Sequence, residues 1–209
     1  MGTALRAPEN QRFMIANLSH QPAESLSTRM TGWFNWSRNR PYMEWTLSKL
    51  NVQPYQHILE VGYGAGHLLE EVGRALKIGF LAGIESSLPL YQQAYRRNKR
   101  LIRQQLLQLH IGELYELSYP SHYFHTIYGS NTHYSWKDPQ MEFIRLSGLL
   151  KSRGRLVMLF QPRTRKDAAI REAAERIEKD YQEAGLTDIR IEYRELYPGT
   201  VISATGFKA

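Results

Sequence analysis

Three glycines at every second position stand between an aliphatic strand and an amphipathic helix, and this bend constrains the fold more than any other feature. It lies within HILEVGYGAGHLLEEVG, residues 57–73. The aliphatic run 58–61 predicts a strand, and apolar residues at helical spacing after Gly66 predict a helix. Glycine lets the backbone turn sharply and approach a ligand, and a helix N-terminus offers free N–H groups. A tight connection without a ligand would need the same glycines, so the bend alone leaves the function open.

The rest of the chain repeats this alternation of strand and helix, which is the pattern of a mostly parallel sheet covered by helices. Further strands are predicted at 80–84, 106–111, 126–128 and 155–160. Further helices are predicted from Pro89, from Pro139 to about Leu150, and from about Asp167 to Gly185. Two final strands, 189–194 and 201–207, have no helix between them and predict an antiparallel edge pair. The expected fold is an α/β doubly wound sheet.

The first 50 residues depart from this pattern. Their aromatic residues crowd into helix-compatible sequence interrupted by Gly32 and Pro41. They are too few for a core of their own, and 209 residues suit one sizeable core. We therefore expect an N-terminal helical extension, residues 1–50, on a main domain, residues 51–209. Its aromatic rings either anchor the extension or form a lid that excludes water.

Composition excludes several classes of site. The chain has no cysteine, which rules out disulfides, thiolate zinc sites and a cysteine nucleophile. No His or carboxylate cluster has metal-ligand spacing, so we expect no metal. The longest apolar runs, such as 156–160, are far shorter than the roughly 20 residues of a membrane helix. Without the apolar stretch of a secretory signal at the N-terminus, we expect a soluble cytoplasmic protein with no membrane partner.

The charge of the chain is compatible with an anionic partner. The formal net charge is +7, with the densest cations in RRNKRLIR, residues 96–103. On a helix these cations occupy more than one face, which is typical of a solvated charge run. A basic balance alone favours nucleic acid only weakly over an anionic metabolite or a simply soluble surface.

An acidic residue at the end of the second predicted strand strengthens the case for a cofactor at the bend. Glu85 lies in GIESS, 19 residues after Gly66. A carboxylate in this position accepts hydrogen bonds from both ribose hydroxyls of an adenosine cofactor. Each such bond contributes about 1.5 to 3 kcal/mol. Alone, Glu85 would be an ordinary solvated carboxylate, so its position relative to the bend carries the inference.

With these residues in place, nearly the whole chain resembles the class I S-adenosylmethionine-dependent methyltransferases, in particular the small bacterial, methyltransferase type 11-like group. LEVGYGAG resembles the family's acidic-x-Gly-x-Gly-x-Gly cofactor loop, and GIESS resembles the segment whose acid holds the ribose. The resemblance implies a Rossmann-like fold and S-adenosyl-L-methionine as cofactor. The residues it implies around the ribose and methionyl parts are Glu60, Gly62, Tyr63, Gly64, Gly66, Glu85 and Ser86.

The segment IGELYELSYP, residues 111–120, resembles the family's adenine-binding stretch. By this resemblance Glu113 faces the adenine amino group and the Leu114 N–H faces an adenine ring nitrogen. Glutamate replaces the usual aspartate at this position. His125 and the pair Ser152 and Arg153 also depart from the family's pattern, but outside the cofactor loop.

The segment GSNTHYSW, residues 129–136, follows the fourth strand, where the family places residues beneath the transferred methyl group. It lacks both prolines of the Asn-Pro-Pro-Tyr motif, which disfavours methylation of a nucleic-acid base. The resemblance implies that Asn131 contacts the cofactor, that Tyr134 acts in catalysis while lining the pocket, and that Trp136 binds the acceptor. His133 is a candidate base, since an imidazole with a pKa near 6.5 accepts a proton from a hydroxyl or amine. The alternative is that it only shapes the pocket.

The segment GWFNWSRNRPYMEWTLSKLNVQP, residues 32–54, resembles the family's hydrophobic cluster and Arg-Asn pair before the cofactor strand. It implies that Trp33 and Tyr42 bind the acceptor and that Arg38 and Asn39 approach the site.

The expected function is in-line methyl transfer to oxygen, nitrogen or sulfur of a small-molecule acceptor. Methylation of RNA or protein, adenosyl-cofactor binding without catalysis, and a nicotinamide-dependent reaction stay open as alternatives.

Overall fold

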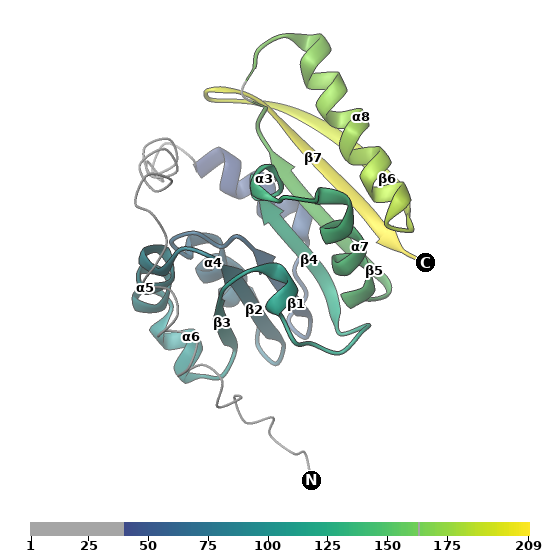
Figure 1. Cartoon of the computed structure of the whole chain (residues 1–209). Helices are drawn as coiled ribbons and strands as arrows, with labels where there is room; N and C mark the ends of the chain where they lie inside the picture. The colour runs from purple at the N-terminus through teal and green to yellow at the C-terminus, as the bar shows by residue number, and fades with distance from the viewer. Residues whose placement is uncertain (1–39, 163) are drawn as a thin grey trace. The chain divides into compact units, whose positions relative to one another are not determined.

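The computed structural model describes residues 40–162 and 164–209. Figure 1 shows these ranges as one sheet with helices packed against it. The strands are β1 (His57–Val61), β2 (Phe80–Glu85), β3 (Leu107–Ile111), β4 (Phe124–Ser130), β5 (Leu150–Phe160), β6 (Leu186–Leu196) and β7 (Gly199–Lys208). The helices are α3 (Arg40–Leu50), α4 (His67–Ala75), α5 (Leu88–Arg97), α6 (Lys99–Arg103), α7 (Pro139–Leu149) and α8 (Asp167–Glu183), with short 3₁₀ turns η3 (Leu114–Glu116) and η4 (His133–Ser135).

The sheet has the order β3-β2-β1-β4-β5-β7-β6 in the described part of the chain. Strands β1 to β5 pair in parallel, whereas β7 pairs antiparallel with both β5 and β6. The predicted fold class is therefore confirmed, including the antiparallel C-terminal strands. The strand order changes direction between β1 and β4, and ligands of such sheets bind beyond the carboxyl ends of the strands at this switch point.

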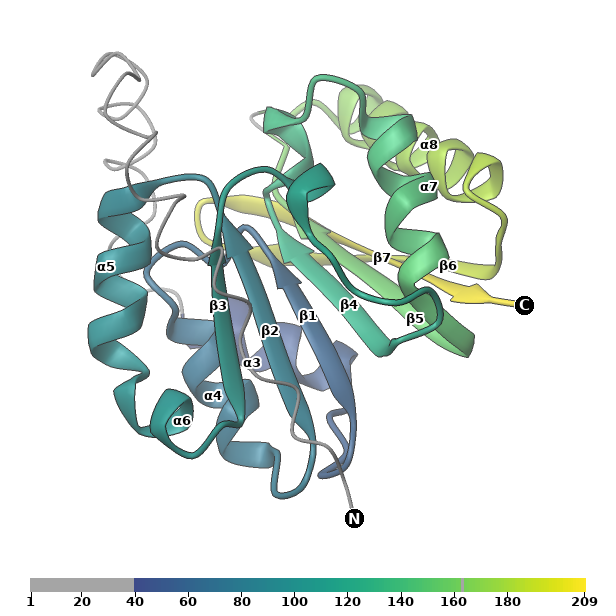
Figure 2. The same cartoon turned by 60° about the horizontal axis from the view of Figure 1, so that its bottom comes forward.

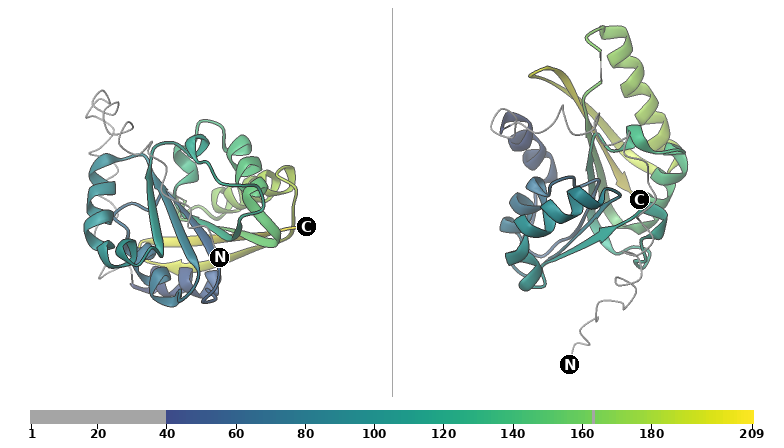
Figure 3. Two further views of the ribbon diagram at one scale, coloured as in Figure 1. Left: turned by 90° about the horizontal axis from the view of Figure 1, so that it is seen from below. Right: turned by 60° about the vertical axis from the view of Figure 1, so that its left-hand side comes forward.

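Helices cover both faces of the sheet. Figures 2 and 3 show α3 and α4 on one face and α7 and α8 on the other. The α7–α8 face is sealed by large apolar side chains, among them the fully buried Phe143 and Tyr181. On the other face α3 contributes Tyr42, Trp45 and Leu50 to the core. None of the helices in the described ranges combines the length and the apolarity needed to cross a membrane.

Two predicted elements differ from the observed ones. The single helix predicted from Pro89 is interrupted at Asn98, which separates α5 from α6. Its side-chain amide donates to the carbonyl of Ala94 (3.0 Å), one turn earlier in α5, and to the distant carbonyl of Gly66 (2.9 Å), and the second, tertiary bond fixes the break. The strand predicted at 155–160 begins earlier, at Leu150.

The predicted N-terminal extension is described only in part. Its last residues form α3, which packs against the main sheet and contacts β5. Trp33, Arg38 and Asn39 lie outside the described residues.

Candidate functional site

The glycine bend joins β1 to α4 through three residues with positive φ: 71° at Gly62, 54° at Gly64 and 75° at Gly66. Glycine adopts this region without steric cost. A Cβ on Gly62 would lie 2.5 Å from Thr132 Oγ1, and one on Gly66 would lie 2.6 Å from Asn98 Nδ2. A Cβ on Gly64 would meet no heavy atom within 4 Å. The outer two glycines are thus packed against protein, while the middle one faces open space.

The Glu85 carboxylate lies directly at this bend. Its Oε2 accepts a hydrogen bond from the Gly64 N–H at 3.0 Å, and its Oε1 accepts one from the Ser87 N–H at 2.9 Å. The side chain is buried, being only 9% exposed. A carboxylate offers about four lone-pair sites, so two backbone donors leave it able to accept two further hydrogen bonds. The structure therefore brings together the glycine bend and the acidic residue that the sequence indicates as a cofactor site.

The side chain of Tyr63 turns away from the open side of the bend. It is buried, and its hydroxyl donates to the His110 carbonyl at 2.9 Å. A Cβ on Gly83 of β2 would lie 2.6 Å from its ring, so the small residue in GIESS makes room for it. Only the backbone of Tyr63 belongs to the bend. Ser86, half-buried, follows Glu85 at the end of β2.

A second carboxylate, Glu60, is buried at 2% exposure one residue before the end of β1. The Tyr128 hydroxyl donates to its Oε2 at 2.6 Å. Burial raises the pKa of Glu60 to about 8, the Tyr128 hydrogen bond lowers it in part, and the nearby Glu85 adds to the rise. The sequence alone does not identify Tyr128. Glu60 and Tyr128 are register partners across β1 and β4, and only the strand pairing reveals this.

Tyr42 reaches the same end of the sheet from α3. Its hydroxyl and the Ser130 hydroxyl at the end of β4 are 2.8 Å apart. Burial raises the pKa of Tyr42 well above its usual value, so this hydroxyl stays protonated. The contact fixes α3 close to the carboxyl end of β4.

Glu113 follows β3, the neighbour of β2. Its side chain accepts from the Glu116 N–H, and the Glu113 N–H donates to Glu116 Oε2 at 2.6 Å, which together form a capping box on η3. Leu114 is buried against the core. The Gly112 N–H donates to the Glu85 carbonyl at 3.0 Å, so the segment carrying Glu113 starts beside Glu85.

Two polar atoms beyond β4 are buried without a hydrogen-bond partner among the described residues: Asn131 Nδ2 and His133 Nδ1. The other end of the Asn131 amide, Oδ1, accepts from the Gln161 N–H at 2.8 Å, which fixes the orientation of that side chain. The ring of His133 lies 4.7 Å from the ring of Phe160. Burial lowers the pKa of His133 to about 4, so the imidazole is neutral near pH 7.

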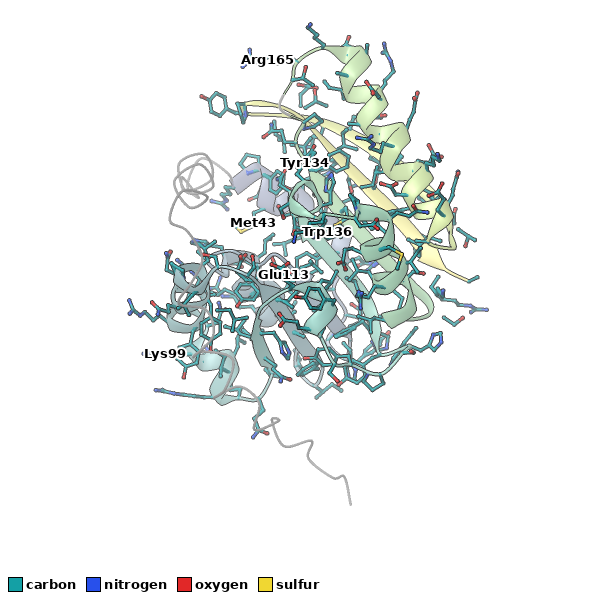
Figure 4. All side chains as sticks on the ribbon, viewed as in Figure 1. Met43, Lys99, Glu113, Tyr134, Trp136 and Arg165 are labelled. Atoms are coloured by element: carbon teal, nitrogen blue, oxygen red, sulfur yellow. The ribbon has the colours of Figure 1, made fainter. Side chains whose placement is uncertain are left out.

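Tyr134 and Trp136 differ in exposure. Tyr134 is 52% exposed and its ring lies 4.2 Å from that of His133. Trp136 is half-buried and packs edge-on against Phe143 of α7 at 5.0 Å. Figure 4 shows both side chains near each other, far from Lys99 on α6. The contact with Phe143 gives Trp136 a packing role in addition to the predicted contact with an acceptor.

Comparisons with known proteins find chains of similar sequence. Residues 59–158 match the family model described as a methyltransferase domain. The chain is 24% identical over 182 residues to an uncharacterized methyltransferase, YdaC, of Bacillus subtilis (strain 168), covering 86% of this chain and 98% of the relative.

Solved structures share the fold. One is a SAM-dependent methyltransferase from Aquifex aeolicus, with a TM-score of 0.64 and 14% identity, covering 80% of this chain and 89% of that one. Another is the Haemonchus contortus phosphoethanolamine N-methyltransferase 2 in complex with phosphomonomethylethanolamine and S-adenosylhomocysteine. It has a TM-score of 0.66 and 12% identity, covering 81% of this chain and 52% of that one.

Proposed function

Because residues 59–158 match the methyltransferase-domain model, we propose that this chain transfers a methyl group from S-adenosyl-L-methionine to an oxygen, nitrogen or sulfur atom of a small-molecule acceptor. The observation that carries the proposal is the 3.0 Å hydrogen bond from the Gly64 N–H to Glu85. It joins the open side of the glycine bend to a carboxylate with spare acceptor capacity.

The residues at the bend fit an adenosyl cofactor. The open space at Gly64 admits a ligand next to the backbone, which a side chain there would obstruct. Glu85 would accept hydrogen bonds from the two ribose hydroxyls. Glu113, at the end of the adjacent strand β3, would face the adenine, and Glu60 the positively charged methionyl part. Solved relatives described as SAM-dependent or as complexes with S-adenosylhomocysteine support this choice of cofactor.

The protein contributes to the reaction by orienting the acceptor atom. When bound, the cofactor supplies a methyl group already activated by the positive charge on sulfur. Asn131, His133 and Tyr134 would hold the acceptor atom in line with that group, with reacting atoms about 3 to 3.5 Å apart. The neutral ring of His133 offers one nitrogen that accepts a hydrogen bond or a proton from a hydroxyl or amine acceptor. The rings of Tyr134 and Trp136 would exclude water.

The first test measures cofactor binding by isothermal titration of the full chain with S-adenosylhomocysteine and, separately, with NAD. We expect S-adenosylhomocysteine to bind and Glu85→Ala to raise its Kd roughly 10- to 100-fold, the range of a lost charge-assisted hydrogen bond. Glu175→Ala on the exposed side of α8 is the matched control and should bind as the wild type does. Preferential binding of NAD, or unchanged affinity in Glu85→Ala, would contradict the proposal.

The second test concerns the acceptor. Release of S-adenosylhomocysteine is measured with metabolite, RNA and protein fractions as alternative acceptors. Release that depends on the metabolite fraction and is lost in Glu85→Ala is the expected result. Release with RNA alone, together with gel-shift binding that weakens steeply with salt, would replace the small-molecule acceptor by RNA.

A further inference from the structure

The outermost strand at one end of the sheet is β6, and its outer edge is unpaired within the described part of the chain. In the strand order β6 stands last, and β7 is its neighbour on one side. In an antiparallel pair, alternate residues direct their N–H and C=O groups to opposite sides. A strand of 11 residues therefore presents a row of donors and acceptors along its outer edge.

The side chains of β6 make this edge complementary to itself. The strand reads LTDIRIEYREL, in which basic and acidic residues alternate around Ile191. If a second copy pairs antiparallel about a two-fold axis at Ile191, residues whose numbers sum to 382 stand opposite each other. Arg190 then faces the partner's Glu192 and Ile191 faces its own copy, both within the stretch from Arg190 onward that pairs regularly with β7. Every central pair is either of opposite charge or apolar, and both kinds stabilise antiparallel pairs.

Other symmetric registers lack this match. Moving the axis by one residue places Arg190 opposite Arg190 or Glu192 opposite Glu192. Moving it by two residues places Ile191 opposite Thr187 or Glu195. Like charges or mismatched polarity across a strand pair are unfavourable, so the sequence selects the register at Ile191.

The two faces of the strand agree with this register. Ile189 and Ile191 pack against the apolar core on the α8 side, so an apolar contact between copies would extend that core. On the α3 side, Lys49 binds Glu192 at 2.6 Å and Arg194 lies over the Trp45 ring at 6.0 Å. Arg190 and Glu192 are both exposed at this surface. Charges on an edge strand often prevent pairing, but here their alternating sign favours it with a second copy.

We propose that two copies of this chain form a symmetric dimer by antiparallel pairing of their β6 strands about Ile191, which joins the two sheets into one. This interface uses one surface twice, as two-fold interfaces do. The proposal is independent of the acceptor and of the cofactor.

A charge exchange tests the register. Sedimentation velocity of the full chain should give a dimer of twice the 24.3 kDa chain mass. Arg190→Glu places like charges opposite each other at two symmetric positions and should raise the dimer Kd about tenfold or more. The double variant Arg190→Glu with Glu192→Arg restores opposite charges and should restore the dimer. Arg103→Glu on α6, beside the other end of the sheet, is the control. A monomer at all concentrations, or a dimer indifferent to Arg190→Glu, would overturn the proposal.

The lack of cysteine permits a geometric test. Directly opposed residues have Cα atoms about 4.5–5.5 Å apart, within the span of a disulfide. Ile191→Cys should therefore form a disulfide-linked dimer under mild oxidation. Glu195→Cys is the control, because in this register the two copies of residue 195 are eight residues apart along the strands, about 27 Å. Equal cross-linking of both variants would show that the pairing is not at Ile191. Unchanged thermal unfolding of the reduced variants confirms that both remain folded.

Discussion

Glu60 is the residue whose charge depends most directly on what occupies the site. Its pKa of about 8, raised chiefly by burial, leaves the carboxyl largely protonated at pH 7. A cation bound close by would favour the charged form and lower this pKa.

We therefore expect cofactor binding at pH 7 to release close to one proton. Isothermal titration with S-adenosylmethionine in buffers of different ionisation enthalpy measures this number. Above pH 8 the release should fall, because Glu60 is then already ionised. In Glu60→Gln it should vanish at all pH values, and a variant that still released one proton would assign it to another group.

The glycines of the bend differ in what they tolerate. Gly66→Ala combines a φ of 75° with a Cβ placed 2.6 Å from Asn98 Nδ2 and 2.8 Å from Ala94 Cβ. Gly64→Ala meets only the backbone cost of about 1–2 kcal/mol. We expect Gly66→Ala to lower the free energy of unfolding by about 1–3 kcal/mol more than Gly64→Ala does. Denaturant unfolding of both variants checks this difference, and equal losses would contradict it.

At this scale the sequence predicts the parts of the site that are local. The glycine spacing predicts the bend, and the end of the second strand predicts the position of Glu85. In the structure the Gly64 nitrogen and Glu85 Oε2 are 3.0 Å apart. Tyr128 was missed because its bond to Glu60 depends on the register of β1 with β4. The sequence also does not reveal that the pKa of His133 is lowered, since the cause is burial beside Phe160.

Among the elements, the helix pair α5–α6 shows where local patterns fail. The sequence predicts one helix, because neither glycine nor proline interrupts residues 90–103. The break at Asn98 arises from its bond to the Gly66 carbonyl, 32 positions away in the chain. Strand β5 shows the opposite case. The sequence predicts a strand only from residue 155, yet β5 begins at Leu150, and its pairing with β4 is irregular between Leu150 and Arg155.

Asn98→Ala tests the role of the hydrogen bonds that Asn98 makes at the break between α5 and α6. It removes two hydrogen bonds from a side chain that is 1% exposed, which should cost about 1–3 kcal/mol of unfolding free energy. Because one bond holds Gly66, we also expect weaker binding of S-adenosylhomocysteine. Thermal unfolding and titration measure the two effects, and the exposed Gln104→Ala serves as the control. A loss of stability without any change in affinity would show that the hydrogen bonds of Asn98 do not affect cofactor binding.

For the whole molecule, Glu60 makes the free energy of unfolding depend on pH. Its pKa in the folded chain is raised above the unfolded value, so the native state binds more protons and this contribution falls as pH rises from about 4.5 to about 8. We expect Glu60→Gln to be more stable than the wild type at pH 8, by at least the roughly 1.4 kcal/mol of one pKa unit. This difference should shrink toward pH 4.5. Denaturant unfolding of both proteins across this range measures it, and a constant difference would contradict the assignment.

The sheet as a whole follows from the alternation of strands and helices, which predicts parallel pairing through β5. The position of β7 cannot be predicted in the same way. No local sequence pattern indicates that the last strand lies between β5 and β6 instead of at the edge of the sheet.

That position has a consequence for synthesis of the chain on the ribosome. The strand that fills the gap between β5 and β6 is translated after both of its neighbours. Until it emerges, the nascent chain holds two strands with unsatisfied edges, a state prone to wrong association. Completion of the sheet is thus a late, long-range event, and chaperones would act most usefully during that interval.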